Sequence, residues 1–534
     1  MTQARAAIPW GEPLLLVHLA LGALLLVIVT ATLADPDLWG HVRFGRDVVA
    51  AGAIPKSDVY SFTADRPWVN HEWLAEVLMY AAYAKGGTPG LVAFKAGLAL
   101  ATIGVVLWSL RRFRPPPMTY DVVAVVTVVG ILWRIQTLRP QVFSLFLFAL
   151  LLLTLSEAAR GRTRALLGVP VIMALWVNLH GGWVVGMGTL AVWLAVALIE
   201  PHQGARRRLI FCGAGLGAAI ATLANPYGVR LWTFLLETVG LRRPDILEWA
   251  SISGIPLGAA IPWIVSVAAA GFVLVRSPLP YRPRDLAVIG VLAVLAFRVN
   301  RLDAFLAIAV VVLLAPEFAQ LWPARSPGAA PWLGAAPPPG AARSPGPAPS
   351  SGARNRPGTT NRRAAIAVTL VAAVAMSLPV ERMIARSLTC LELTPEWLPE
   401  PEATEFIRAG RLQGNVLTWF DWGEYIIWQF GPGLKVSIDG RRETLYSDEQ
   451  LASHYRFYRN ESDAVGSPAV GFPESLHADY IWLPRRFPVV DALRQQGWET
   501  AFEGPVSILF SRRTGLRLAA ADPRLSSPRC FPGP

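Results

Sequence analysis

The stretch PLLLVHLALGALLLVIVTATLADPDLWGH, residues 13–41, decides the fold class. Its first part is an almost unbroken apolar run up to Leu33, with the roughly 20 residues that an α-helix needs to cross a bilayer. The apolar core of a secretory signal peptide is shorter, at about 7 to 15 residues. The second part places Asp35, Asp37 and His41 directly after that helix. The stretch therefore predicts a first transmembrane helix that leads into a polar loop.

The whole chain shares this apolar character. Its 534 residues are 53% hydrophobic and only 16% charged, and its mean hydropathy is +0.41. These values exclude an ordinary soluble enzyme and predict a polytopic membrane protein in the lipid bilayer. The net charge of +12 would suit nucleic acid only if it were clustered on a folded, solvent-facing surface. It is spread over short Arg-rich loops instead, so we expect no nucleic-acid partner.

Further apolar runs bring the expected number of spans to about eleven. They lie near 90–110, 119–134, 141–156, 166–179, 183–199, 208–224, 258–275, 285–297, 303–321 and 364–380. By the positive-inside rule, the short Arg-rich loops between them are expected in the cytoplasm. The N-terminus is then cytoplasmic, whereas loop 35–88 and the C-terminal part are extracytoplasmic. The expected location is a bacterial inner (plasma) membrane.

Composition divides the chain into five parts: 1–321, 322–363, 364–380, 381–514 and 515–534. The first is predicted to be the transmembrane domain. The second has no acidic residue and is dominated by Pro, Gly, Ala and Ser, which predicts a disordered cytoplasmic linker. The third is the last span. The fourth alternates apolar segments such as VLTWF and YIWL with turn signals, which predicts a small extracytoplasmic α/β domain, and the fifth is a flexible tail.

The three cysteines, Cys212, Cys390 and Cys530, match no zinc-binding spacing. Cys212 lies in an apolar run and is expected to pack as a small side chain. A disulfide between Cys390 and Cys530 is one of the alternatives open to the other two.

Polar residues gather at what this topology makes the outer surface. They are Asp35, Asp37, His41, Asn70, His71, Glu72, Arg134, Arg139, Asn178, His180, Asn225, Tyr227, Glu248, Arg298, Asn300 and Arg301. Ionisable groups near a membrane are costly and often functional, so their convergence predicts a site. Snorkelling arginines and Asn-Pro turns would explain part of the set without any site. The nearby Trp39, Trp68 and Trp73 suit either an interfacial aromatic belt or sugar stacking.

The tripeptide DPD at 35–37 has two interpretations. Two carboxylates two residues apart can share a divalent cation, such as Mg²⁺ or Mn²⁺, through oxygen ligands. Alternatively, Asp35 caps the helix that follows Pro36, because Asp is favoured at the N-cap and Pro at the first helical position. The second interpretation leaves Asp37 free for chemistry.

The tripeptide HEW at 71–73 lacks the second histidine of the HExxH zinc motif, because Ala75 stands four residues after His71. A zinc-protease site is therefore excluded. His71 and Glu72, together with Asp37 and His41, form another candidate metal group whose distances the sequence does not fix.

Residues 33–52, LADPDLWGHVRFGRDVVAAG, resemble the first outer loop of the GT-C membrane glycosyltransferases. In that superfamily an Asp just after the first span begins an amphipathic helix that ends near a Gly, and Asp37 to Gly52 match this layout. The following segment resembles the one that leads such enzymes into their next span. The resemblance extends distantly to protein mannosyltransferases and aminoarabinose transferases.

Residues 416–445, VLTWFDWGEYIIWQFGPGLKVSIDGRRETL, resemble the WWDYG region of the oligosaccharyltransferase catalytic subunit. That motif contacts the acceptor peptide, so the resemblance makes Trp419, Asp421 and Trp422 candidates for acceptor binding or for bracing the cleft. Phe420 and Trp422 depart from the motif, and the second outer loop has no clear DxE pair. Peptide N-glycosylation is therefore not implied.

The resemblance implies transfer of a sugar from a polyprenyl-phosphate donor to an extracytoplasmic acceptor. Such chemistry needs a carboxylate that accepts the acceptor's proton, and Asp37 is the candidate base. His71 and Glu72 are candidates for orienting the base, holding a metal or contacting the acceptor.

Cations must also stabilise the leaving phosphate. Arg298 and Arg301 either hold it through paired guanidinium hydrogen bonds or anchor a helix end. His41 and His180 are further candidates for substrate contact, although a turn alone also explains the two glycines after His180. Two other classes stay open: a transporter or flippase for a lipid-linked sugar, and an inactive GT-C-like scaffold. A transporter would more often show repeated halves, which this sequence lacks.

Overall fold

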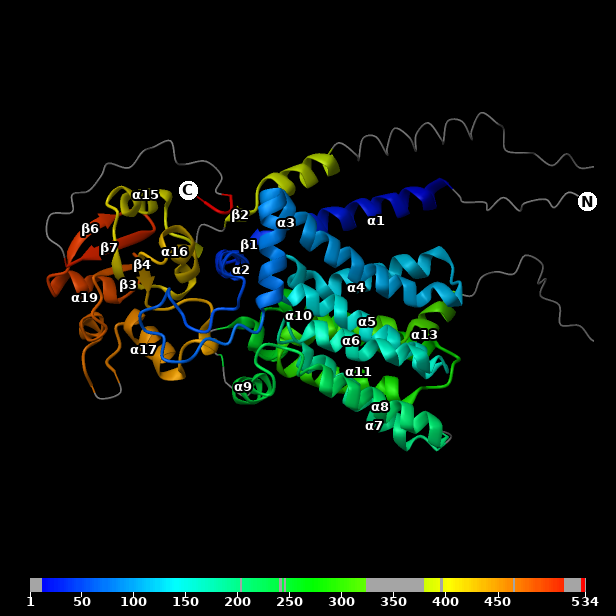
Figure 1. Cartoon of the computed structure of the whole chain (residues 1–534). Helices are drawn as coiled ribbons and strands as arrows, with labels where there is room; N and C mark the ends of the chain where they lie inside the picture. Colours follow the sequence, from blue (N-terminus) through cyan, green and yellow to red (C-terminus); the bar gives the residue numbers. More distant parts are fainter. Residues whose placement is uncertain are drawn as a thin grey trace, which may run out of the picture.

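The computed structural model describes residues 12–201, 204–239, 243, 246–322, 379–393, 397–463, 466–512 and 530–533. In Figure 1 these residues form a bundle of helices beside a smaller unit of strands and short helices, and α2 lies between the two. We call the smaller unit, residues 397–512 with 530–533, the tail unit. The predicted linker 322–363, the last predicted span 364–380 and the predicted tail 515–534 lie almost entirely outside the described residues.

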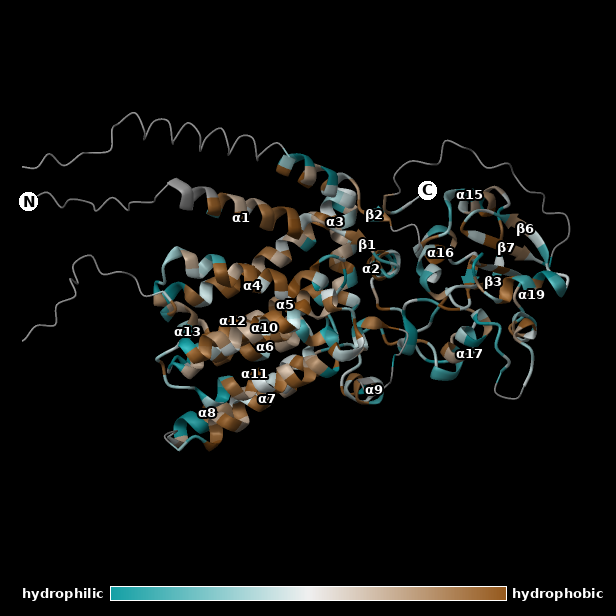
Figure 2. Ribbon diagram, turned by 180° about the vertical axis from the view of Figure 1, so that it is seen from behind, coloured by the Kyte–Doolittle hydropathy of each residue, from teal (hydrophilic) through white to brown (hydrophobic). Residues whose placement is uncertain are grey.

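The bundle helices follow the predicted apolar runs. They are α1 (Glu12–Thr30), α3 (Trp73–Leu110), α4 (Pro117–Ile135), α5 (Gln141–Ala159), α6 (Gly168–Trp176), α7 (Trp183–Ile199), α8 (Ala205–Ala221), α10 (Leu257–Arg276), α11 (Pro283–Arg298), α12 (Asp303–Leu313) and α13 (Ala315–Gln320). A short helix, α9 (Arg230–Val239), lies at the end of the bundle that faces the tail unit, and its Phe234 packs on His71. Figure 2 shows hydrophobic residues along the bundle helices and hydrophilic residues at the end of α8.

Among the residues that the structure describes, four helices are long and apolar enough to cross a bilayer. They are Trp73–Phe113, Pro117–Ile135, Gln141–Ala159 and Leu257–Arg276, and shorter apolar helices cover Val17–Thr30, Thr163–Trp176 and Trp183–Ile199. The predicted helical architecture of the membrane type is confirmed at this level. The count of about eleven spans stays a prediction.

Loop 35–88 contains one complete helix and the beginning of another. Its first part is α2 (Leu38–Ala51), which ends at Gly52 with a φ of 60°, so the predicted amphipathic helix is present. Its last part belongs to α3, which begins at Trp73 and continues past a kink at Gly87, where φ is 57°. Pro89 follows and cannot donate an N–H to the preceding turn, which explains why the direction changes there.

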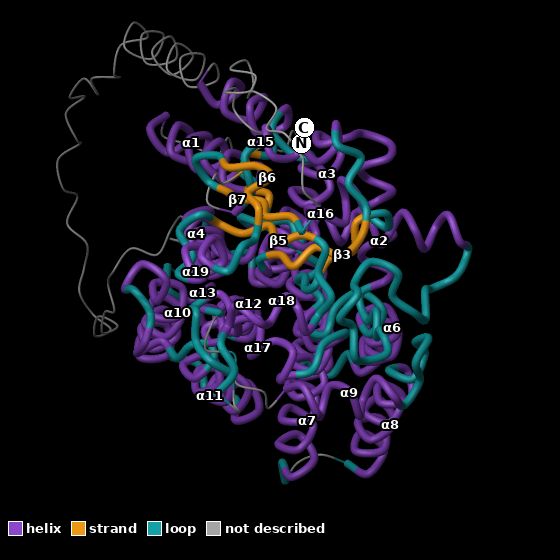
Figure 3. The backbone as a smooth tube through the Cα atoms, turned by 90° about the vertical axis from the view of Figure 1, so that its left-hand side faces the viewer, coloured by secondary structure: helices purple, strands orange, loops and turns teal. Residues whose placement is uncertain are grey.

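The tail unit is built on a five-stranded sheet in the order β4-β3-β5-β7-β6, whose strands are orange in Figure 3. The strands are β3 (Gly414–Thr418), β4 (Leu434–Val436), β5 (Tyr480–Pro484), β6 (Glu499–Glu503) and β7 (Ser507–Ser511). β3 runs parallel to both β4 and β5, and β7 runs antiparallel to both β5 and β6. The helices are α15 (Pro401–Ala409), α16 (Gly423–Phe430), α17 (Asp448–Tyr458), α18 (Phe472–Ser475) and α19 (Val489–Gln495).

The tail unit and α2 share one hydrophobic core. Trp39 of α2 packs on Tyr425 of α16, with ring centroids 5.6 Å apart, and on Phe531, at 5.1 Å. The indole Nε1 of Trp39 donates to the carbonyl of Pro532 at 2.8 Å. Burial of large aromatic side chains contributes strongly to such contacts. The helix after the first span is therefore fixed by residues from the other end of the chain.

Backbone pairing reinforces this junction. β1 (Leu33–Ala34) pairs in parallel with β2 (Glu392–Leu393), next to the disulfide between Cys390 and Cys530. The amide of Val436 donates to the carbonyl of Tyr60 at 2.9 Å. The segment before α3 therefore lies along the free edge of β4 and adds to the sheet there. Segments that are hundreds of residues apart thus form a single junction around α2.

Replacing Trp39 with Ala should destabilise this junction. Trp39 is 1% exposed, and truncating a buried aromatic side chain costs about 3 to 5 kcal/mol. Thermal unfolding of the detergent-purified protein measures the effect. Trp133→Ala is the matched control, because Trp133 on α4 is 41% exposed. Equal losses of melting temperature in the two variants would show that Trp39 does not hold the junction.

Candidate active site

Asp37 occupies the N-cap position of α2, yet its side chain makes no capping hydrogen bond. Its Oδ2 lies 3.2 Å from Nη2 of Arg139, which comes from the loop between α4 and α5, and 26% of the side chain is exposed. Arg139 also forms an ion pair with Asp35, which is buried. Burial alone would lower the pKa of Arg139, but the two carboxylates outweigh burial and raise it. Arg139 is therefore a permanent cation between two carboxylates.

The prediction that Asp35 caps α2 is wrong. The N-cap position belongs to Asp37, two residues later, because the helix begins after Asp37. Oδ1 of Asp35 accepts the amide N–H of Asp37 at 3.0 Å, and its carbonyl accepts that of Leu38 at 3.1 Å. Such bonds form an Asx turn, which leads the chain from α1 into α2.

Metal binding at Asp35 and Asp37 stays a prediction. Across the described ranges, no group of three or more His, Cys, Asp or Glu side chains is arranged to hold a metal ion. Asp35 already uses its carboxylate for Arg139 and for the turn.

A second group surrounds Glu72, in the turn before α3. Oε1 of Glu72 lies 3.5 Å from Nε2 of His71 and 3.6 Å from Nε2 of His180. Burial on its own would raise the pKa of Glu72, but His71, His180, His41 and Arg301 outweigh it and lower the pKa. The structure thus brings the predicted Glu72, His71 and His180 together around one ionised carboxylate.

His180 is held as a neutral hydrogen-bond donor. Its Nδ1 accepts the amide N–H of Gly182 at 3.0 Å and lies 2.7 Å from Oγ of Ser144, which itself accepts the indole N–H of Trp176. Because Nδ1 is an acceptor, the ring hydrogen is assigned to Nε2, on the side of Glu72. Burial lowers the pKa of His180 to about 3, so the ring stays uncharged at neutral pH.

His41, on the first turn of α2, faces a carboxylate of its own. Its Nδ1 lies 3.6 Å from Oε1 of Glu76, whose other oxygen accepts from Nδ2 of Asn70 at 2.6 Å. Burial alone would lower the pKa of His41, but the hydrogen bond to Glu76 and the nearby carboxylates raise it. The amide of Asn70 donates to the hydroxyl of Tyr227, which anchors this group to the bundle.

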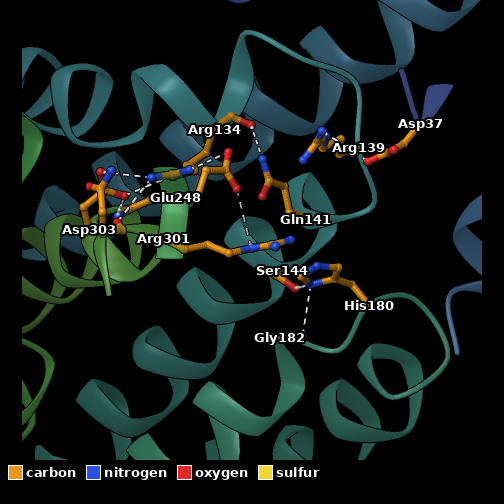
Figure 4. A network of polar contacts seen from close by, with 12 residues as sticks. Asp37, Arg134, Arg139, Gln141, Ser144, His180, Gly182, Glu248, Arg301 and Asp303 are labelled. Atoms are coloured by element: carbon orange, nitrogen blue, oxygen red, sulfur yellow. Dashed lines mark hydrogen bonds and ion pairs between the residues drawn. The ribbon is translucent and has the colours of Figure 1, made fainter. Parts of the chain in front are cut away.

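The arginines predicted to hold phosphate behave differently. Nε of Arg301 lies 3.9 Å from Glu248, which also pairs with Arg134 at 2.8 Å. Arg134 in turn contacts Asp303 at 3.2 Å. In Figure 4 the end of the Arg301 side chain points away from Glu248, toward Ser144 and His180.

Arg298 is exposed at the end of α11, and the described residues include no ion-pair partner for it. Among the described residues, Arg301 therefore joins the network of ion pairs around Glu248 and Arg298 does not.

The tail unit adds Asp421 to the same site. Asp421 lies in a short turn before α16, and burial, reinforced by the nearby charge of Asp37, raises its pKa to about 7. Trp419 is partly exposed and packs on Trp422, with ring centroids 5.8 Å apart. Trp422 is 0% exposed and packs on Trp482. The burial of Trp422 favours the predicted bracing role over contact with a substrate.

Three residues of the site escaped sequence analysis: Glu76, Ser144 and Glu424. Glu76 stands one turn after Glu72 in an otherwise apolar segment, and Glu424 directly follows the TWFDWG motif, so position alone would have flagged both. Ser144 gives no such signal, because a serine in an apolar helix usually bonds to its own backbone.

No protein-family model and no curated protein sequence matches the chain. Solved structures do match it. The oligosaccharyltransferase of Archaeoglobus fulgidus in the apo form is 12% identical, over 89% of this chain and 70% of that one, with a TM-score of 0.53. The archaeal oligosaccharyltransferase AglB from the same organism, in complex with an inhibitory peptide and a dolichol-phosphate, is 13% identical over the same shares, with a TM-score of 0.50. ArnT from Cupriavidus metallidurans bound to undecaprenyl phosphate is 12% identical, over 96% of this chain and 100% of that one, with a TM-score of 0.49.

At these identities the likeness shows the fold alone. The chain is similar in fold to the archaeal oligosaccharyltransferase, so the resemblance found in its sequence is confirmed at the level of the fold.

The raised pKa of Asp421 predicts a pH-dependent effect of Asp421→Asn. The folded state binds this proton more tightly than the unfolded chain, in which the pKa is 3.8, so wild-type stability falls as the pH rises from about 4 through 7. Asn carries no charge, so the melting temperature of the variant minus that of the wild type should be greatest above pH 7 and shrink toward pH 4. Thermal unfolding at several pH values measures this difference. Asp491→Asn, at an exposed position on α19, controls for the chemical change. A difference that does not vary with pH would contradict the assignment.

Proposed function

We propose that this chain is a membrane glycosyltransferase that transfers a sugar from a polyprenyl-phosphate-linked donor to an extracytoplasmic acceptor. The observation that carries the proposal is the setting of Asp37. This carboxylate follows α1 directly, is fixed by Arg139 of the bundle, and lies close enough to Asp421 of the tail unit to raise the pKa of Asp421. The GT-C fold supports the reaction class.

The reaction needs a base for the acceptor. In the proposed step, the acceptor's hydroxyl or amide group gives its proton to the Asp37 carboxylate, and the acceptor atom bonds to the anomeric carbon of the sugar. The bond from that carbon to the phosphate oxygen breaks, and its electron pair leaves with the polyprenyl phosphate. Arg139 holds Asp37 in one orientation at 3.2 Å, which favours such a transfer.

The leaving phosphate needs positive charge and hydrogen-bond donors. Nε2 of His180 lies 3.6 Å from Oε1 of Glu72, and Arg301 is close enough to lower the pKa of the same carboxylate. His180 stays neutral, so its Nε2 hydrogen can be donated to a phosphate without adding a positive charge that would repel Arg301. The similar archaeal oligosaccharyltransferase structure contains a dolichol-phosphate, which supports a polyprenyl-phosphate carrier.

The remaining predicted residues suit the acceptor side. Trp419 and Asp421 lie in the tail unit beside Asp37, His71 and Glu72 lie in the turn before α3, and His41 lies one turn into α2. We infer the orientation from the charge of the loops, with the N-terminus in the cytoplasm and the tail unit outside it. Under this proposal the protein belongs in a bacterial inner membrane, with the predicted last span 364–380 joining the linker to the tail unit.

Asp37→Asn should abolish transfer without loss of the protein. General-base catalysis contributes about 10²- to 10⁴-fold, and the amide cannot accept the proton. Membranes containing the protein are incubated with labelled polyprenyl-phosphate sugars, and new glycosidic bonds are measured. Asp491→Asn, at an exposed position of the tail unit, is the matched control and should keep its activity.

Two outcomes would overturn the proposal. Movement of the intact labelled carrier across the membrane without any new bond would identify a transporter. Undiminished transfer by Asp37→Asn would remove Asp37 as the base.

A further inference from the structure

The N-terminus of α2 has an unusual cap. The first amides of a helix lack partners within the helix, and the side chain of the N-cap residue normally accepts one from the second or third helical residue. Asp37 is the N-cap residue of α2, and its carbonyl accepts the amide of His41 at 3.0 Å. Its side chain accepts no amide and pairs with Arg139 instead.

A residue from the tail unit takes this place. Oε2 of Glu424 accepts the amide N–H of Gly40, the third residue of α2, at 3.1 Å. Glu424 belongs to the first turn of α16 and is 4% exposed. The cap of α2 is therefore supplied by a side chain 384 residues away in sequence.

Two glycines make room for this carboxyl group. A Cβ at Gly40 would come within 2.1 Å of Oε2 of Glu424. A Cβ at Gly440 would come within 2.8 Å of Oε1 of Glu424 and 2.3 Å of Oδ1 of Asp37. Contacts this short force the carboxyl groups to move, so glycine at both positions lets Glu424 and Asp37 keep their places. Gly440 also shows that the carboxyl groups of Glu424 and Asp37 converge on the same point.

We propose that Glu424 is a positioning residue for Asp37: by capping α2 from the tail unit, it leaves the Asp37 side chain free to face Arg139 and the acceptor. Without Glu424, the vacant amide of Gly40 recruits the nearest carboxylate, which is the N-cap side chain of Asp37 itself. The Asp37 carboxylate then turns toward the first amides of α2 and away from the acceptor. The effect on catalysis rests on the proposed function. The capping of α2 by Glu424 does not depend on it.

The charge of Glu424 is not needed for this role. Within the described residues no cation pairs with it, because the nearby Arg441 pairs with Asp439 and Asp58. Burial, together with the charges of Asp37 and Asp439, raises the pKa of Glu424 well above its usual value, against the effect of Arg441. Gln keeps the accepting oxygen at the same length and is the conservative replacement. Met has a similar size but neither donates nor accepts strongly.

Hydrogen exchange tests the cap without any substrate. Peptides that cover 35–45 are followed by mass spectrometry in the detergent-solubilised full chain. Asp37→Ala alone should leave exchange of the first turn of α2 unchanged, because Asp37 does not cap it. Glu424→Met should raise exchange only modestly, because Asp37 replaces the lost cap. The double variant should raise exchange by more than the sum of the two, which is the signature of one shared partner.

Transfer kinetics test the positioning. Glu424→Met should lower kcat by about 10- to 100-fold, as expected for a misplaced catalytic group, with a much smaller change in KM. Glu424→Gln should recover most of the lost rate. Gly40→Ala should reproduce the loss of Glu424→Met, because the new Cβ expels the carboxyl group while Ala itself favours the helix. Glu405→Met, at a half-exposed position on α15, is the matched control.

The possible failures are distinguishable. If Asp37→Ala raises exchange as much as Glu424→Met does, Asp37 is the cap and the inference falls, whatever the activity. A wild-type kcat in Glu424→Met, or a Glu424→Gln variant as slow as Glu424→Met, also overturns it. If the exchange pattern is as expected but the wild type transfers no sugar, the proposed function fails and the cap stands.

Discussion

The ion pair of Arg139 with Asp35 and Asp37 is the interaction on which the rest of the site depends. It joins the loop between α4 and α5 to the turn between α1 and α2. Removing one partner of a buried pair leaves an uncompensated charge and costs about 3 to 5 kcal/mol. The amide of Leu33 also donates to the carbonyl of Gln136 at 2.8 Å, so backbone and side chains fix the same point. The direction of α2, and with it the docking of the tail unit, follows from this anchor.

Charges spread outward from this anchor in an alternating order. Arg139 has Asp37 and Asp421 on one side and Glu248 on the other. Arg301 lies between Glu248 and Glu72. Alternation gives each arginine a carboxylate partner, whereas the like charges of Asp37 and Asp421 meet where the tail unit joins the site and raise the pKa of Asp421. The neutral His180 interrupts the series where another cation would repel Arg301. Under the proposed function, this arrangement would offer both a carboxylate and a cation to one substrate.

Local sequence patterns predicted the elements but not the partnerships. The apolar run, the DPD turn and the glycine at 52 were enough to predict the helix after α1, because each acts within a few residues. The cap was misplaced by two residues, since the Asx turn at Asp35 and an N-cap there have the same local signature. For Trp422 the sequence left acceptor binding and bracing of the cleft both open, because the packing of Trp482 against it depends on how β5 meets α16.

The partners that shape the site lie far apart in the chain, which is why sequence alone missed them. Glu424 and Gly40 are separated by 384 residues, and Arg139 and Asp35 by 104. No periodicity connects such pairs, because they meet only after the bundle and the tail unit have formed.

The shared core of α2 and the tail unit has a consequence for biosynthesis. The buried face of α2, with Leu38, Trp39 and Phe44, leaves the ribosome almost 400 residues before Tyr425 and Trp422 exist to cover it. At about 5 to 20 residues per second, that interval lasts roughly 20 to 80 s. During this time the apolar face of α2 is uncovered beside the first apolar run, and a bilayer surface is the nearest apolar environment for it. Asp37 therefore lacks its neighbours from the tail unit until the last strands are made. A chain truncated before the tail unit would lack the same neighbours of the proposed base.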